Sequence, residues 1–154
     1  MIILPGDLSD PRVIELLRIH LAQARAESPA RSVHALDLTG LQGPDISFWA
    51  AWEDDVLVGV GALRRLTDDH GEVKSMHTAQ ALRGRGAGGA ILRHIIAAAR
   101  ARGFSRLSLE TGSMAYFEPA RALYRRHGFR ESPPFGEYGI DPNSVFMTLE
   151  LPLT

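Results

Sequence analysis

A glycine-rich turn that opens into a long apolar helix is the feature that most constrains this chain. At Gly86, Ala87 and Gly88 the backbone N–H groups are covered by little or no side chain. A helix that begins there presents its first unpaired N–H groups and the positive end of its dipole, which together form an anion site. Arg83 and Arg85 add guanidinium groups whose geometry suits phosphate. The sequence therefore predicts that this turn binds a phosphorylated ligand.

The residues after the turn have the spacing of an amphipathic helix. Its apolar positions recur at helical intervals, namely Ile91, Leu92, Ile95, Ile96 and Ala99. Gly103 follows, and glycine commonly ends a helix because it adopts the left-handed conformation without strain. We therefore predict a helix over residues 86–102.

Two other kinds of phosphate-binding loop fit this turn less well. A Walker A loop needs Lys followed by Ser or Thr after its last glycine, but Gly89 is followed by Ala90. The dinucleotide fingerprint G-x-G-x-x-G is matched literally by Gly84, Gly86 and Gly89. A dinucleotide turn, however, follows directly from its strand, whereas here the preceding strand is predicted to end near Thr78 and a spacer intervenes. Because no second nucleotide-binding half is evident either, we favour neither loop.

The turn and its surroundings resemble the GCN5-related N-acetyltransferases, the GNAT superfamily. The run Arg83-x-x-Gly86-x-Gly88 is similar to their pyrophosphate loop, which reads Gln/Arg-x-x-Gly-x-Gly/Ala. The order around it is also similar: a strand, a short spacer, the loop, a long helix, a strand and a shorter helix. That shorter helix carries Leu-Tyr and ends in Gly-Phe, as residues 122–129 do here. The resemblance covers residues 49–151, and the first third of the chain carries no family-wide motif.

The order of elements indicates an α+β fold in a single domain over residues 1–154. Alternating and turn-bounded segments predict strands at residues 46–52, 56–66, 72–78, 106–110 and 144–151, with a short strand at 1–4. Further helices are expected from Pro11 to about Ala26 and over 117–127, while 31–44 reads as an irregular segment. The resemblance implies a GNAT-like mixed, mostly antiparallel central sheet with helices on both faces.

The composition excludes several classes of function. There is no cysteine, so neither a disulfide nor an acetyl-cysteine intermediate can form. A net charge of −1 gives no reason to expect nucleic acid or an anionic membrane as a partner. No apolar run approaches the ~20 residues of a membrane span, and the histidines lack metal-binding spacing. We therefore expect a cytoplasmic protein that binds no metal, and the sequence is compatible with a homodimer.

The resemblance also implies roles for individual residues. In the superfamily the strand before the loop contacts the pantetheine arm of acetyl-CoA through its backbone, and Met76, His77 and Thr78 match that position. An acidic residue on the same strand often deprotonates the acceptor amine through water, which makes Glu72 the candidate base. The tyrosine of the Leu-Tyr helix usually gives a proton to the departing thiolate, and here that residue is Tyr124. Residues 83–89 would hold the pyrophosphate.

Each of these assignments has a simpler alternative. Tyr124 could be a core tyrosine with a bonded hydroxyl, and Glu72 could be a solvated charge at a strand edge. Glu110, at the carboxyl end of the crossover strand, is a rival base or a ligand of the acceptor amine, and its simpler alternative is a salt bridge within the sheet opening. His77 could also serve as a base, because imidazole titrates near neutral pH. Tyr138 belongs to a Pro/Gly-rich loop and is either a lid over the acceptor or a packing residue.

Together these features predict an acetyl-CoA-dependent N-acetyltransferase. It would transfer the acetyl group directly to a primary amine of a small molecule or amino acid, without a covalent enzyme intermediate. A second hypothesis is a CoA-binding regulatory or sensor domain without turnover. Release of free thiol in the presence of amines separates the two.

Overall fold

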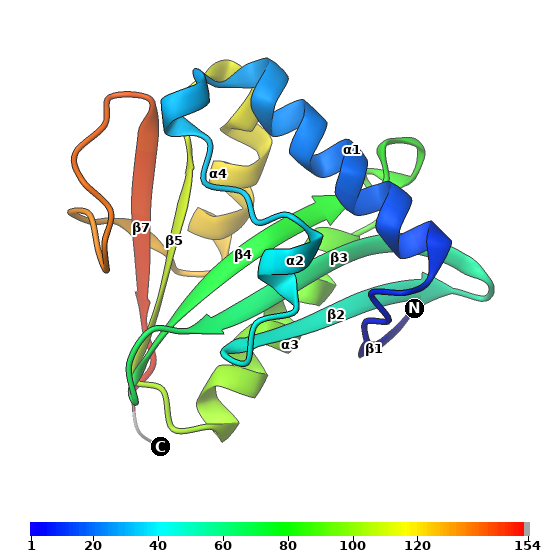
Figure 1. Cartoon of the computed structure of the whole chain (residues 1–154). Helices are drawn as coiled ribbons and strands as arrows, with labels where there is room; N and C mark the ends of the chain where they lie inside the picture. The colour runs from blue at the N-terminus through cyan, green and yellow to red at the C-terminus, as the bar shows by residue number, and fades with distance from the viewer. Residues whose placement is uncertain (153–154) are drawn as a thin grey trace.

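Seven strands form one sheet in the computed structural model, which describes residues 1–152 (Figure 1). The strands are β1 (Ile2–Pro5), β2 (Ile46–Glu53), β3 (Val56–Arg65), β4 (His70–Thr78), β5 (Arg106–Gly112), β6 (Arg130–Glu131) and β7 (Ser144–Glu150). Their order across the sheet is β1-β2-β3-β4-β5-β7-β6. Only β4 and β5 pair in parallel, and every other neighbouring pair is antiparallel. This arrangement confirms the predicted mixed, mostly antiparallel sheet.

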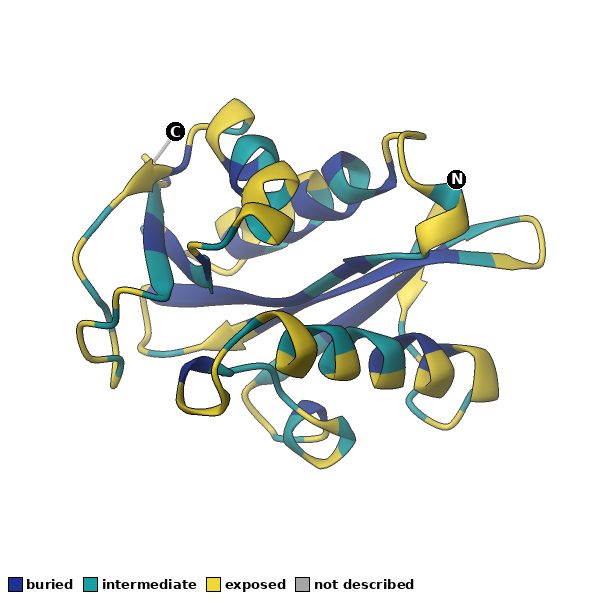
Figure 2. Cartoon of the chain, turned by 90° about the horizontal axis from the view of Figure 1, so that it is seen from above, coloured by how far each residue is buried: buried dark blue, intermediate teal, exposed yellow. Residues whose placement is uncertain are grey.

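Helices cover both faces of the sheet, as the resemblance implied. They are α1 (Pro11–Glu27), α2 (Leu38–Leu41), α3 (Ala87–Ala101) and α4 (Glu118–Arg126), with short 3-10 turns at Ala30–Ser32, Gln80–Leu82 and Ala115–Phe117. Figure 2 shows the buried strands between two helical layers, with α1 and α2 on one face and α3 and α4 on the other. A ligand can therefore reach the sheet only where the two helical layers do not cover it.

Each face of the sheet has its own apolar core. The apolar stripe of α3 packs against β-strand residues such as Leu107 and Leu109, together with Tyr124 of α4. On the opposite face Val13, Leu16 and Leu17 of α1 pack with Leu41 of α2 and with β2 and β3. The period of the apolar residues in α1 and α3 thus fixes which side of each helix faces the sheet.

The sheet is divided between β4 and β5. These strands pair only through His70, Gly71 and Glu72, opposite residues 106–108. Beyond that point β4 follows β3, while β5 follows β7 to its end, and the two arrows diverge in Figure 1. A bulge in β4 contributes to the divergence, because Val60 faces His77 although the next pair is Ala62 with Lys74. The result is a V-shaped gap that exposes the inner edge of β4.

The structure confirms the predicted strands and long helices and corrects one segment. Residues 31–44, expected to be irregular, contain α2, whose first turn is capped by Asp37: its carboxylate accepts a hydrogen bond from the Gly40 N–H at 2.8 Å. The sequence also gave no sign of β6, which is two residues long and pairs with β7. Both elements are too short for a periodic pattern to reveal them.

The packing of α3 predicts a large difference between two substitutions in that helix. Ile95 is fully buried, so Ile95→Ala should lower the free energy of unfolding by about 2–5 kcal/mol. Arg100 lies on the exposed side of the same helix, and Arg100→Ala should cost less than about 0.5 kcal/mol. Urea unfolding measures both values. Equal losses for the two variants would contradict the placement of α3 on the sheet.

Candidate active site

A cavity of about 460 Å³ occupies the gap between β4 and β5. It brings together most of the predicted site residues, which come from β4, the glycine turn, β5 and α4. The predicted residues that line it are Glu72, Met76, His77, Thr78, Arg83, Gly84, Gly86, Ala87, Gly88, Gly89, Glu110 and Tyr124. Arg85 and Tyr138 do not line this cavity, although Tyr138 contacts a residue that does.

The glycine turn forms one end of the cavity. Gly84 and Gly86 have φ angles of +84° and +82°, which favour glycine, and a Cβ at either position would have no atom within 4 Å. Gly86 precedes α3, and its carbonyl accepts the first helical bond, from the Ala90 N–H at 3.0 Å. The N–H groups between these two residues therefore have no intrahelical acceptor. This end of the cavity has the open backbone and the helix dipole that a pyrophosphate needs.

The two arginines of the turn have different surroundings. Arg83 lines the cavity beside the open turn. The guanidinium of Arg85 instead lies 3.7 Å from the carboxylate of Glu53, at the tip of the β2–β3 hairpin. Of the two predicted phosphate ligands, Arg83 is thus the better placed.

The inner edge of β4 runs along the cavity from Glu72 to Thr78. On its outer side His77 and Thr78 pair with Val60 and Gly59 of β3. On the inner side β5 has already diverged, and no partner strand follows Glu72 within residues 1–152. The backbone at Met76–Thr78 can therefore bond to an extended ligand, as the resemblance implied.

Tyr124 of α4 extends from the helical layer to the cavity. Its ring is buried and packs edge-on against Phe129, with 5.9 Å between ring centroids. Its hydroxyl makes no hydrogen bond to any residue in the part of the chain that the structure describes. Burial, with a contribution from the charge of Glu110, holds the pKa of Tyr124 far above its usual range. The ring of Tyr124 thus packs in the core. Its hydroxyl is protonated and is free to donate a hydrogen bond or a proton.

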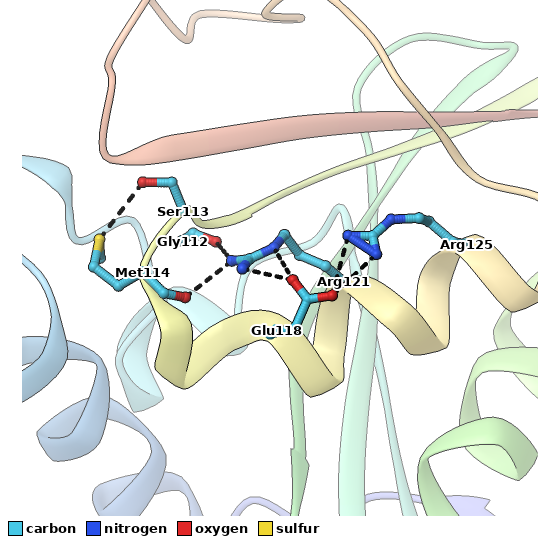
Figure 3. A network of polar contacts seen from close by, with 6 residues as sticks. All are labelled: Gly112, Ser113, Met114, Glu118, Arg121 and Arg125. Atoms are coloured by element: carbon cyan, nitrogen blue, oxygen red, sulfur yellow. Dashed lines mark hydrogen bonds and ion pairs between the residues drawn. The ribbon is translucent and has the colours of Figure 1, made fainter.

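An arginine network fixes the start of α4 against the end of β5 (Figure 3). Buried Arg121 donates to the carbonyls of Gly112 and Met114, and its guanidinium pairs with Glu118 at 2.8 Å. Arg125 adds a second contact to Glu118 at 3.2 Å. Because α4 carries Tyr124 and β5 carries Glu110, this network sets the position of one relative to the other.

Glu110 is a half-buried carboxylate at the cavity with one side-chain partner within residues 1–152. It accepts a hydrogen bond from the Ser144 hydroxyl at 2.6 Å, and it forms no ion pair within residues 1–152. Burial raises the pKa of Glu110 to about 7, although the Ser144 bond and the charge of Lys74 act in the opposite direction. The alternative of a salt bridge within the sheet opening is therefore wrong. A carboxylate that titrates near neutral pH is suited to accept a proton.

Glu72 is the centre of a buried polar cluster that the sequence did not reveal. Its Oε2 accepts a hydrogen bond from the Tyr138 hydroxyl at 2.6 Å and lies 3.3 Å from Nζ of Lys74. Both charged side chains are almost fully buried, so Glu72 is not the solvated edge charge that the simpler alternative supposed. Its Oε1 is also buried and has no hydrogen-bond partner. Lys74 was not singled out, because a lone strand lysine usually points to solvent.

Two histidines pair on the wall of the cavity. Nδ1 of His20, in α1, lies 3.1 Å from Nδ1 of His77, so one nitrogen donates to the other. Burial lowers the pKa of each imidazole to about 4. Both rings are therefore neutral at pH 7, and the predicted alternative of His77 as a base has little support. Residues 1–152 contain no cluster of His, Asp or Glu that could hold a metal ion.

Among residues 1–152, no helix combines the length and the apolar character that crossing a membrane would require.

Sequence comparisons agree with this geometry. The Acetyltransferase (GNAT) family model matches residues 13–129, which include the glycine turn and the Leu-Tyr helix. The chain is 52% identical over 145 residues to the uncharacterized N-acetyltransferase YsnE of Bacillus subtilis, covering 94% of this chain and 96% of that protein. It is 46% identical over 120 residues to the IAA acetyltransferase of Azospirillum brasilense, covering 77% of each.

A solved structure has the same fold. The chain aligns with a GNAT family acetyltransferase from Elizabethkingia anophelis, crystallised with acetyl-CoA bound, at a TM-score of 0.71 over 97% of both chains and 21% identity. The glycine turn, the free edge of β4 and the open N-terminus of α3 fit the same cosubstrate. The chain therefore belongs to the GNAT family and is an acetyl-CoA-dependent N-acetyltransferase.

Proposed function

We propose that this enzyme transfers the acetyl group of acetyl-CoA directly to a primary amine of a small molecule. The observation that carries the proposal is the single cavity between β4 and β5, which joins the glycine turn to Tyr124 and Glu110. One end is an anion site, and the other holds a proton donor and a proton acceptor. Amide formation from a thioester needs these features in one place.

Acetyl-CoA would lie along the free edge of β4. The N–H groups at Gly86–Gly89 and the Arg83 guanidinium would bind its pyrophosphate, since all of these line one end of the cavity. The backbone at Met76–Thr78 would bond to the extended pantetheine arm. This placement leaves the thioester between β4 and α4, on the side of Tyr124.

The reaction moves two protons in opposite directions. The amine nitrogen attacks the acetyl carbon, the C–N bond forms and the C–S bond breaks. The nitrogen gives up a proton to a carboxylate, and the departing thiolate takes one from the Tyr124 hydroxyl. The buried phenol suits the second role because it is protonated and has no other partner.

Of the two carboxylates at the cavity, Glu110 suits the role of base better than Glu72. Glu72 is already held by Lys74 and Tyr138. Glu110 is bonded only to Ser144 among side chains, and its pKa of about 7 lies near the operating pH. The base role predicted for Glu72 stays a prediction, and a direct comparison of the two variants decides between them.

The acceptor walls come from segments between the longer helices and strands. They include residues 32–35 and the 3-10 turn Ala115–Phe117. IAA, the compound in the name of the Azospirillum relative, is one compound to test against this enzyme. The single domain, the cytoplasmic location and the homodimer stay predictions.

The role of the glycine turn predicts a loss of CoA affinity when a side chain is added there. Gly86→Asp places a negative charge at the anion site and should weaken CoA binding more than about tenfold. Gly103→Asp is the matched control, because Gly103 ends the same helix with φ +81° and equally open space. It should bind CoA normally. Titration calorimetry on both folded variants checks this, and unchanged affinity in Gly86→Asp would remove the pyrophosphate assignment.

The role of Tyr124 predicts a catalytic defect without a stability defect. Tyr124→Phe keeps the ring against Phe129 and loses no hydrogen bond, so its melting temperature should stay close to that of the wild type. Its kcat should fall by roughly 10²-fold, with little change in CoA affinity. Steady-state kinetics and thermal melts measure these quantities. Wild-type turnover in a folded Tyr124→Phe protein would leave another group or water to protonate the thiolate.

The choice of base predicts a specific pH profile. A base must be ionised to accept a proton, so kcat/KM calculated on the concentration of uncharged amine should rise with pH and level off above about 7, where Glu110 becomes deprotonated. Glu110→Gln should lower kcat/KM and abolish the limb that ends near pH 7. Glu72→Gln should retain a limb of this kind. The opposite pattern, with the limb lost only in Glu72→Gln, would assign the base to Glu72.

A further inference from the structure

The acceptor end of the cavity lies on the face of the sheet that α1 covers. Lys74 of β4 bonds to the carbonyl of His34, in the segment after α1, and His77 pairs with His20 of α1. Figure 2 shows α1 and α2 on the face of the sheet opposite α3, the helix that follows the glycine turn. The groups that meet an acceptor there decide which amines the enzyme takes.

Within residues 1–152, the one cationic side chain that lines this end of the cavity, Lys74, is already fully engaged. An ammonium group has three N–H donors, and Nζ of Lys74 lies 3.3 Å from the His34 carbonyl, 3.3 Å from Glu72 Oε2 and 3.1 Å from the Tyr138 hydroxyl. Its charge is balanced by Glu72 at the same site. Lys74 thus has no donor left for a further anion.

The other cationic side chains that line the cavity lie at the CoA end. Within residues 1–152 these are Arg83, in the glycine turn, and Arg126, the last residue of α4. The end of α4 adjoins the start of α3, because a Cβ at Gly89 would lie 3.6 Å from His127. Neither arginine belongs to the acceptor end.

Within residues 1–152, the other side chains that line this end carry no fixed positive charge. In the same range Ser144 is the one side-chain partner of Glu110, whose carboxylate can accept a hydrogen bond from an amine. Burial lowers the pKa of His20 and of His77 to about 4, so neither carries a positive charge at neutral pH. An amine finds partners among these groups. A carboxylate moved out of water to the same place finds no free cation, and burying it unpaired is costly.

From this arrangement we infer that the acceptor is an amine with no carboxylate beside its amino group, so that free α-amino acids are poor substrates. The inference rests on the proposed transfer to small amines and narrows it. Lys74 positions the side chains of Glu72 and Tyr138. Because all three of its N–H donors are used in these contacts and in the bond to His34, it cannot bind the carboxylate of an amino-acid acceptor.

The test compares pairs of amines that differ only in the carboxylate, together with one carboxylate that has no amine. Tryptamine and L-tryptophan share one ring and one amino group, and indole-3-acetate has the ring and the carboxylate but no amine. Agmatine and L-arginine form a second pair without an aromatic ring. Thiol release from acetyl-CoA at pH 8 gives kcat/KM for each amine, and inhibition of the better amine by indole-3-acetate gives its affinity.

We expect the decarboxylated member of at least one pair to exceed its amino acid by about tenfold or more in kcat/KM. The comparison is conservative, because an α-amino group is less basic than an alkylamine and more of it is uncharged at pH 8. Indole-3-acetate should not compete with tryptamine. Ratios below about tenfold in both pairs, or competition by indole-3-acetate, would overturn the inference while leaving amine acetylation in place.

Two further results separate this inference from the proposed function. If acetyl-CoA raises the melting temperature but neither pair is acetylated, both the transfer to small amines and the inference that narrows it are overturned. In the double variant Glu72→Gln/Lys74→Gln, which removes both charges of the pair and is checked for folding by the same shift, the ratio within a pair should change by less than about twofold. A selective loss of amino-acid acetylation in that variant would show that Lys74 binds the carboxylate, which contradicts the inference.

Discussion

The short parallel contact between β4 and β5 determines what the rest of the structure can do. The two strands pair through three residues of each and then diverge, so the sheet holds together at one end and opens at the other. Along the gap, β4 stays paired antiparallel with β3, and β5 stays paired antiparallel with β7. A backbone edge inside a sheet would normally be paired, and here it is left for an extended ligand. The cavity, the glycine turn and both proton-transfer candidates are all arranged around that opening.

The two faces of the gap have different chemistry. On the α3 face, small residues and a helix N-terminus provide an anion site without requiring a buried charge. On the α1 face, Glu72 and Lys74 form a buried ion pair that Tyr138 completes. Removing one partner of such a pair leaves an uncompensated charge, so the pair is maintained as a unit.

That polar cluster also ties together the walls of the acceptor end. Tyr138 belongs to the loop before β7, and Lys74 reaches the His34 carbonyl. The Ser32 hydroxyl bonds to Asp141 of the same loop, and the Tyr116 hydroxyl donates to Gln23 of α1 at 2.8 Å. Segments far apart in sequence thus close one side of the cavity. This cross-linking gives the acceptor end a defined shape although its loops have no regular structure.

The sequence predicted best where local pattern determines structure. The apolar period and the flanking glycines placed α3 within one residue of its observed ends, Ala87 and Ala101. The glycine turn and the Leu-Tyr helix are contiguous motifs, so the resemblance to the family could be read from them, and the roles it implies for the turn and for Tyr124 stay predictions.

Contacts between residues far apart in the sequence could not be predicted from local patterns. Lys74 meets Tyr138 across 64 positions, and His20 meets His77 across 57. No local pattern marks a strand lysine as buried, because its burial depends on a distant loop. The pKa of Glu110 likewise follows from its burial and not from its neighbours in sequence.

In the mechanism we propose, the glycine turn and the free edge of β4 form one continuous CoA site. Backbone amide chemical shifts of ¹⁵N-labelled protein, followed during titration with CoA, test this at the level of single residues. We expect the largest changes at Gly86–Gly88 and at His77 and Thr78, while Gly103 at the other end of α3 stays unchanged. Saturable binding of CoA that leaves the amides of the turn and of β4 unmoved would contradict it.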